Sequence, residues 1–213
     1  MRTDQLVDWL AADAPRVPRR AVSRRLVLAL AVALPVSFAW MLVAYGVRRD
    51  LIEAMFWPMF WVRLLFGACI ALAGFVVVQR LARPGVRVRG AWLGLAAPVL
   101  LIWALALLVL FVAPPGERTA LVMGRTWRSC TIDIAVMSLP MFVGLLWALR
   151  GLAPTRPAWA GAAAGAMAGG AGAWIYAFHC PELAAPYIAV WYVAGIALPV
   201  VAGALVGPRL LRW

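Results

Sequence analysis

Residues Ala91–Val112 have the sequence AWLGLAAPVLLIWALALLVLFV, which contains no charged side chain. An α-helix needs about 20 apolar residues to cross the roughly 30 Å hydrocarbon core of a bilayer. Hydrocarbon offers no hydrogen-bond partner to an open strand edge, so a run of this kind indicates a helix. The stretch therefore predicts a membrane-spanning helix.

Five further apolar runs of similar length occur in the chain. Of its 213 residues, 66% are hydrophobic and only 13% are charged, whereas about a quarter are charged in a typical soluble domain. We predict an all-α polytopic membrane protein with a bundle of six transmembrane helices over residues 26–213, preceded by a cytoplasmic segment over residues 1–25. The expected spans are Leu26–Val47, Met59–Gln79, Ala91–Val112, Cys130–Leu149, Ala158–Phe178 and Tyr187–Val206.

Arginine supplies every basic side chain, and the arginines are distributed unevenly among the predicted loops. Fourteen lie before the first span, between the second and third, between the fourth and fifth, or after the sixth, and five lie in the opposite loops. Positive residues are enriched on the cytoplasmic side of membrane proteins. We therefore expect both termini to be cytoplasmic, and the net charge of +12 requires no nucleic-acid partner.

Glycines recur at four-residue spacing in the last two predicted spans. This spacing lets two helix backbones approach closely and predicts that these spans pack together. The residues concerned are Gly161, Gly165 and Gly169 in one span and Gly203 and Gly207 in the other.

Ionisable and thiol groups are rare within the spans. Arg63 and Asp133 lie about one turn from the outer ends, where we expect them to reach the interface or to pair with each other. Cys69, near the middle of the second span, is expected to be a small buried apolar residue.

Two other cysteines are predicted to meet at the outer face. Cys130 begins the fourth span, and His179-Cys180-Pro181-Glu182 follows the fifth. The short turn between these spans makes them antiparallel neighbours. Two interpretations are open: a structural disulfide, or a thiol pair that changes state with oxidant or a soft metal, with His179 and Glu182 alongside. The set lacks the C-x-x-C spacing typical of a zinc site, and no cofactor is predicted.

The N-terminal segment is predicted to contain a short helix from Thr3 to Ala14, ended by Pro15 and Pro18. A helix lying on the negative inner leaflet would carry basic side chains, whereas this one is acidic. Docking to a basic, grooved protein partner is one interpretation, and a leader packed loosely on the bundle is the other. The candidate binding residues are Asp4, Leu6, Asp8, Trp9, Leu10 and Asp13.

Five motifs distributed along the chain carry a family resemblance. They are D-Q-L-V-D-W-L-A-A-D-A-P-R-V-P at Asp4–Pro18, R-L-A-R-P-G at Arg80–Gly85, S-L-P at Ser138–Pro140, W-A-L-R-x-L-A-P-T-R-P at Trp147–Pro157 and H-C-P-E at His179–Glu182. Together they resemble the NrsF family, which are six-span bacterial anti-sigma factors named as negative regulators of sigma F.

The resemblance implies a regulator and not an enzyme. It implies that the chain holds an extracytoplasmic-function sigma factor inactive at the bacterial inner membrane. It also implies that a cysteine pair, matching Cys180 and Cys130 here, responds to heavy metal or oxidative stress.

Two functions of other classes fit the sequence less well. A membrane thiol oxidoreductase using Cys130 and Cys180 would need a C-x-x-C motif or a partner on the quinone side, and neither is visible. A small-molecule transporter would need polar residues at mid-membrane, where the sequence has almost none.

Overall fold

The structure of the chain is a computed structural model that describes residues 3–12, 21–83, 86, 88, 90–152 and 154–212. Within these residues the secondary structure is helical, with no strand, which confirms the all-α prediction. The elements are α1 (Thr3–Ala12), α2 (Ala21–Ala44), α3 (Leu51–Met55), α4 (Pro58–Leu81), α5 (Ala91–Val112), α6 (Arg118–Met123), α7 (Trp127–Arg150), α8 (Pro157–Tyr176), α9 (Ala185–Tyr187), the π-helical turn η1 (Ile188–Tyr192) and α10 (Val193–Leu210).

Five helical segments are long and apolar enough to cross a membrane. They are Val22–Ala44, Pro58–Leu81, Ala91–Val112, Arg118–Arg150 and Ala185–Leu210. The remaining predicted span corresponds to α8, which has 20 residues but is composed mostly of alanine and glycine. Because these residues carry little apolar surface, α8 does not meet the same criterion, and the count of six spans remains a prediction.

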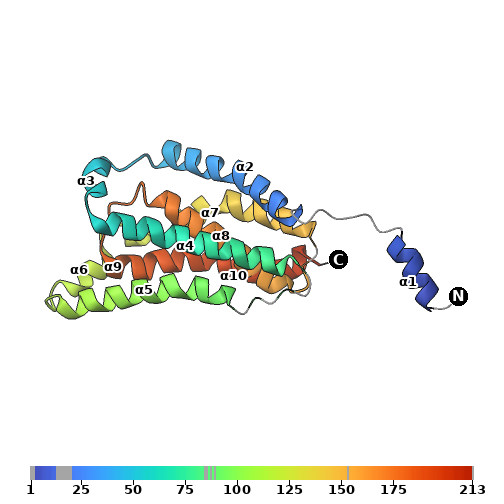
Figure 1. Ribbon diagram of the computed structural model, residues 1–213. Coiled ribbons are helices and arrows are strands. Elements are labelled where there is room, and N and C mark those ends of the chain that lie inside the picture. The colour runs from blue at the N-terminus through green and yellow to red at the C-terminus, as the bar shows by residue number, and fades with distance from the viewer. Residues whose placement is uncertain are drawn as a thin grey trace.

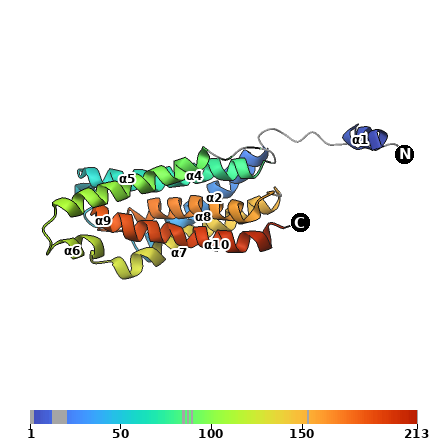
Figure 2. The ribbon, with the colours of Figure 1, turned by 90° about the horizontal axis from the view of Figure 1, so that it is seen from below.

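Helix α8 forms the centre of the bundle. Most of its residues are buried, and α4, α7 and α10 pack around it. Helix α2 packs mainly on α7, and α5 lies along α4 (Figure 1). The second view shows the long helices running side by side along one common direction (Figure 2). The helix with the smallest side chains is therefore the one that the others approach most closely.

Glycine makes the contact between α8 and α10 possible. A Cβ atom on Gly161 would overlap the carbonyl of Gly203, and one on Gly165 would overlap the carbonyl of Pro199. The same holds for Gly207 against the carbonyl of Pro157. The two predicted glycine series thus do pack against each other, which confirms that interpretation.

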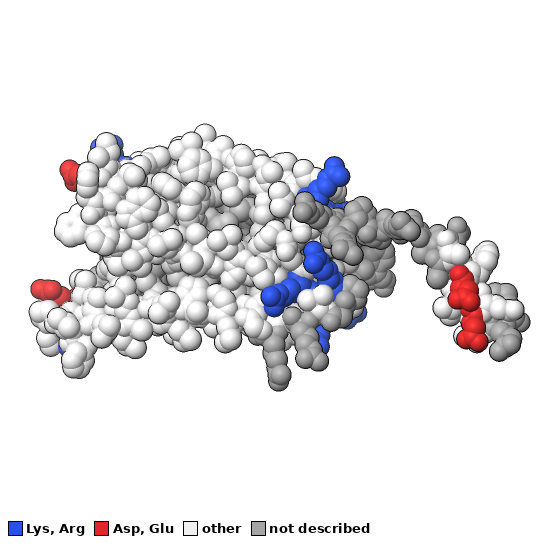
Figure 3. Space-filling model, in the orientation of Figure 1, with Lys and Arg blue, Asp and Glu red and all other residues white. Residues whose placement is uncertain are grey.

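On the face shown in Figure 3, charged side chains gather at the two ends of the bundle, and the long side between them is uncharged. We call the end near the C-terminus the arginine-rich end; among the described residues it holds Arg24, Arg25, Arg80, Arg83, Arg150, Arg156, Arg209 and Arg212. We call the opposite end the thiol end, because Cys130 and Cys180 lie there. Helix α1 projects away from the arginine-rich end (Figure 1).

Candidate functional site

The thiol end brings Cys130 and Cys180 into contact. Cys130 lies in the first turn of α7, and Cys180 lies in the loop between α8 and α9. Both side chains are fully buried, and the two thiols are within hydrogen-bonding reach of each other. Both are free thiols. The predicted meeting of these cysteines is therefore confirmed.

Backbone hydrogen bonds place Cys180 at the end of α8. The amides of His179 and Cys180 both donate to the carbonyl of Tyr176, at 3.0 Å in each case. This closing turn stops the helix, and Pro181 follows it. Because α7 and α8 are antiparallel neighbours, the turn at the end of α8 lies beside the start of α7.

His179 and Glu182 point to partners other than the thiols. His179 Nδ1 lies 2.9 Å from the carbonyl oxygen of Gly46, in the connection after α2. Glu182 Oε1 accepts a hydrogen bond of 2.7 Å from the backbone amide of Arg125. Across the described residues no three His, Cys, Asp or Glu side chains converge in a way that could hold a metal ion. The four predicted sensor residues are neighbours, but only the cysteines share a site.

Arg63, in α4, lies fully buried beside Cys180. Its Nη1 donates to the carbonyls of Cys180 at 2.9 Å and Glu182 at 2.5 Å, and its Nη2 donates to the carbonyl of Ala177 at 2.7 Å. The guanidinium also lies 5.9 Å from the ring centroid of Tyr192. The expectation that Arg63 reaches the interface or pairs with Asp133 is therefore wrong, because the carbonyls of the loop after α8 hold it inside the protein.

A second arginine secures the same loop from the α2 side. Arg48 donates from Nη1 to the carbonyl of Cys180 at 3.1 Å and forms a two-point ion pair with Asp50, at 2.8 and 2.6 Å. The backbone amide of Arg48 donates to the carbonyl of Phe178. The hydrogen bonds from Arg48 lower the pKa of Asp50 from its ordinary value to about 2. The connection after α2 is thus bound to the cysteine-bearing loop.

Tyrosines complete the surroundings of the thiol pair. Tyr176, Tyr187 and Tyr192 are all buried, and the hydroxyl of Tyr187 lies 2.8 Å from the hydroxyl of Thr126. The hydroxyl of Tyr192 is buried and has no hydrogen-bond partner among the described residues. The tyrosine rings fill this part of the core, and the hydroxyls of Tyr176 and Tyr187 find hydrogen-bond partners there.

The electrostatic surroundings favour a thiolate at Cys180. The hydrogen bond with Cys130 lowers the pKa of the Cys180 thiol, and the positive charge of Arg63 lowers it further. Burial acts in the opposite direction, since it disfavours the charged form. A thiolate is the form of cysteine that reacts with oxidants and soft metals.

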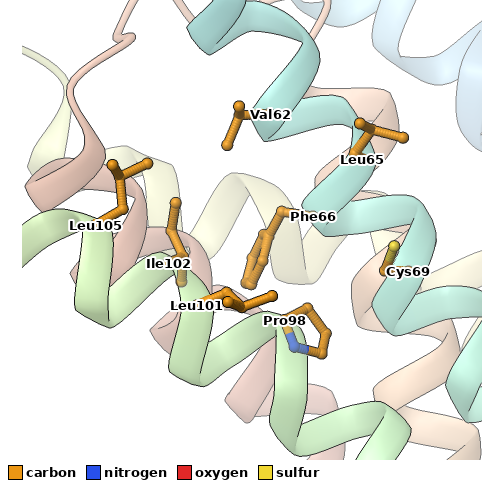
Figure 4. A pocket seen from close by; sticks show the side chains of 8 residues that line it. All are labelled: Val62, Leu65, Phe66, Cys69, Pro98, Leu101, Ile102 and Leu105. Carbon is orange, nitrogen blue, oxygen red and sulfur yellow. The ribbon is translucent and has the colours of Figure 1, made fainter.

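The third cysteine lies far from this pair. Cys69 is exposed on α4, where it lines an apolar pocket of about 360 Å³ between α4 and α5 (Figure 4). The expectation that it is buried is wrong, because α4 and α5 leave an open pocket at this position. The side chains around it are Val62, Leu65, Phe66, Pro98, Leu101, Ile102 and Leu105.

The candidate binding residues of the N-terminal segment are described only in part. Helix α1 begins at Thr3 as predicted and ends at Ala12, and Asp13 lies outside the described residues. Asp4, Asp8 and Trp9 are exposed. Leu6 and Leu10 belong to α1, but their side chains lie outside the described part. The structure therefore presents an exposed acidic helix.

Sequence reasoning missed the residues that surround the thiols. Only Arg63 could have been found from the sequence, since an ionisable residue inside an apolar span points to a functional site by default. Nothing in the sequence indicated that Arg48 and Tyr192 belong to this site, because the contacts that bring them there, with the Cys180 carbonyl and the Arg63 guanidinium, join segments distant in sequence.

The fold and the thiol end define a helical membrane-type protein with a buried thiol pair at one end and an acidic helix at the other. Residues 10–213 match the family model described as negative regulator of sigma F, NrsF. The chain belongs to this family of negative regulators.

Two curated relatives align with the whole chain. The probable anti-sigma-F factor NrsF of Azospira oryzae is 42% identical over 213 residues, and the anti-sigma-F factor NrsF of Caulobacter vibrioides is 41% identical over 215 residues. In both cases the alignment covers all of this chain and all of the relative. No solved structure matches the chain.

Proposed function

We propose that this protein is an anti-sigma factor that holds an extracytoplasmic-function sigma factor inactive at the bacterial inner membrane. Membership of the family of negative regulators of sigma F supports this role, as does the name of each full-length relative. The observation that carries the proposal further is the contact between the Cys130 and Cys180 thiols. The pair senses heavy-metal or oxidative stress and, when it reacts, releases the sigma factor.

The membrane orientation follows from the charge at the two ends. The arginine-rich end is cytoplasmic, in agreement with the positive-inside rule, so both termini lie in the cytoplasm. The thiol end then lies at the opposite side, toward the oxidising compartment. Helix α8, buried among α4, α7 and α10, is the sixth helix to cross the bilayer.

Helix α2 joins the two ends and is the proposed route of the signal. It is followed by the connection that holds Arg48 and Asp50, and it is preceded by the segment that leads back to α1. Few of its residues are buried, since it packs mainly on α7. A change at Cys130, at the start of α7, would therefore alter the helix on which α2 rests. For release, the reacted pair must favour the α2 position that does not bind sigma factor.

The acidic helix α1 is the proposed docking element for the sigma factor. Val7 and Trp9 are large apolar side chains that are more than half exposed, and Asp4 and Asp8 add negative charge. An isolated helix of about three turns is marginal in water, so it gains stability by binding a partner. A basic, grooved surface of the sigma factor is the partner that fits.

Capture of the sigma factor by the purified full-length protein tests the proposal. The double variant Val7→Asp and Trp9→Asp should reduce capture at least tenfold, because it places charge in the apolar contact. Ile52→Asp, an equally exposed apolar position in α3 at the thiol end, is the matched control and should bind normally. Undiminished capture by the double variant would exclude α1 as the docking helix, and no capture by the wild type would exclude the anti-sigma role.

A thiol oxidoreductase fits the structure less well. Exchange with a protein or quinone substrate requires access to a sulfur atom, whereas both thiols are fully buried. Burial of this kind suits a sensor that meets small oxidants or ions.

A further inference from the structure

We propose that Arg63 is the fixed counter-ion of a Cys180 thiolate, so that Cys180 is the reactive cysteine of the pair and Cys130 the one that resolves it. This inference rests on the proposed sensor function of the pair. It assigns different roles to the two cysteines and gives Arg63 a positioning role in the reaction.

Arg63 is a buried cation whose hydrogen-bond partners are neutral. Its two terminal nitrogens are bound by the carbonyls of Ala177, Cys180 and Glu182, and its Nε has no partner. Carbonyl groups satisfy the donors of a guanidinium, but they do not neutralise its charge. A buried charge is costly unless an opposite charge accompanies it.

Among the described residues no carboxylate forms an ion pair with Arg63. Across the described residues the one ion pair joins Arg48 to Asp50, and the Asp50 side chain is half exposed. The Asp50 carboxylate interacts with Arg63 but is already paired with Arg48, so the remaining ionisable groups that interact with Arg63 are the Cys180 thiol and the Tyr192 hydroxyl. A thiol ionises more readily than a phenol, since their ordinary pKa values are about 8.5 and about 10. Cys180 is therefore the group that becomes the anion beside Arg63.

The other charged and titratable groups around Cys180 come from every neighbouring element. They are Arg48 before α3, Cys130 and Asp133 in α7, Tyr176 in α8, Tyr187 in α9, Tyr192 in η1, and His179 and Glu182 in the same loop. Arg48 adds a second positive charge, since its Nη1 donates to the Cys180 carbonyl. The side chains of His179 and Glu182 are bound to Gly46 and Arg125, respectively.

The electrostatic environment of Cys130 is opposite in sign to that of Cys180. Cys130 lies beside the hydroxyl of Tyr187 and near the carboxylate of Asp133. A neighbouring negative charge disfavours a second anion. The two thiols are thus in contact but unequal, with the cationic side at Cys180.

This asymmetry fixes the order of events with a two-electron peroxide oxidant. The Cys180 thiolate attacks one peroxide oxygen, the O–O bond breaks, and hydroxide leaves, so that Cys180 becomes a sulfenic acid. The Cys130 sulfur then attacks the Cys180 sulfur; the disulfide forms, and the Cys130 proton leaves with the hydroxyl group as water. Two thiols are oxidised, and one peroxide is reduced.

The test measures sulfenic acid at Cys180 in the full-length protein in lipid nanodiscs, without sigma factor. Cys130→Ser is the background, because its hydroxyl can still donate a hydrogen bond to Cys180 and the variant stops the reaction at the sulfenic acid. A dimedone-type reagent traps this acid for mass spectrometry. The rate of trapping after hydrogen peroxide is followed from pH 5 to pH 10. The pH midpoint of the rate should lie below the ordinary cysteine value of about 8.5.

Variants at Arg63 separate charge from structural support. Arg63→Gln should raise the midpoint by about one unit or more and reduce the rate at pH 7 at least several-fold, because the counter-ion is lost. Arg63→Lys keeps the charge and should keep the midpoint low. Arg128→Gln, at the same end but with its guanidinium 5.3 Å from the ring of Trp127, is the matched control and should change nothing.

An unchanged midpoint in a folded Arg63→Gln protein, judged by its elution as a single species, overturns the proposal. If Arg63→Gln does not fold, the Cys130→Ser protein alone tests the proposal. A pH midpoint of its trapping rate at or above about 8.5 also overturns the proposal. Faster trapping at Cys130 in Cys180→Ser than at Cys180 in Cys130→Ser has the same consequence. Because no sigma factor is present, these results are independent of whether the protein binds one.

Discussion

The hydroxyl of Tyr45 donates a hydrogen bond of 3.1 Å to Oδ1 of Asp133, and the hydroxyl of Tyr176 donates one of the same length to Oδ2. Tyr45 directly follows α2, and Asp133 lies in α7 about one turn beyond Cys130. One carboxylate therefore joins α2 to both helices that bear the thiol pair, since α8 leads into the Cys180 loop.

Removing the Tyr45 hydroxyl should uncouple α2 from the thiol end. We expect Tyr45→Phe to cost about 1 kcal/mol of stability, below the usual range for a hydrogen bond to a charged group because this one is only partly buried. We also expect weaker release of sigma factor on peroxide treatment. Thermal unfolding in detergent and sigma capture before and after oxidation measure the two effects.

Tyr176→Phe is the matched control, because it removes the other hydrogen bond to the same carboxylate without touching α2. Equal loss of release in both tyrosine variants would show that Asp133, and not its link to α2, is what matters.

Replacing either buried thiol should abolish the oxidative response. Peroxide should join Cys130 and Cys180 in the wild type, because the two thiols are within hydrogen-bonding reach of each other. Cys130→Ser and Cys180→Ser should form no intramolecular disulfide and should retain the sigma factor. Peptide mapping under non-reducing conditions identifies the bridge.

Cys69→Ser controls for loss of a thiol as such, since Cys69 lies exposed on α4 away from the pair. Normal release of the sigma factor by both single serine variants of the pair would leave the cysteines without a sensing role.

The ion pair between Arg48 and Asp50 should give the thiol end an acid-sensitive stability. The pKa of Asp50 is lowered to about 2 in the folded protein, so its contribution is complete above the ordinary aspartate value and is lost as the pH falls toward 2. Wild type should therefore melt at a higher temperature than Asp50→Asn at pH 6. The difference should shrink between about pH 4 and about pH 2.

The effect should be small, because the Asp50 side chain is half exposed and exposed ion pairs contribute little. Glu53→Gln, a neighbouring carboxylate in α3, serves as the control. A difference between wild type and Asp50→Asn that does not depend on pH would contradict the ion-pair explanation.

The contact between α8 and α10 should tolerate no side chain at its glycines. Gly161→Val places atoms where the Gly203 carbonyl lies, so we expect a loss of about 3 kcal/mol or more, at or above the usual cost of overpacking. The yield of folded protein on size-exclusion chromatography and its melting temperature report the loss.

Gly116→Val is the matched substitution, because nothing lies within 4 Å of a Cβ at that position. It should fold like the wild type. If Gly161→Val is equally well tolerated, the close approach of α8 and α10 does not determine the packing.

The sequence by itself determined the helical class, most of the helix positions and the approach of the two cysteines. Long uncharged runs such as Ala91–Val112 leave a helix as the one way to satisfy the backbone in hydrocarbon. The short connection between α7 and α8 then forces Cys130 and Cys180 to the same end. Glycine spacing likewise predicted which helices touch, since only glycine removes the Cβ atoms that would keep two backbones apart.

Only the tertiary structure decided which side of each helix faces the protein. Arg63 and Cys69 lie six residues apart in α4, yet the arginine is buried and the cysteine is exposed, contrary to what their polarity suggests. Apolar runs specify burial in lipid or in protein equally well, so composition cannot distinguish the two. The partners of Arg63 are backbone carbonyls of a loop more than 110 residues away. Because every residue has a backbone carbonyl, the sequence does not show which of them accepts a hydrogen bond.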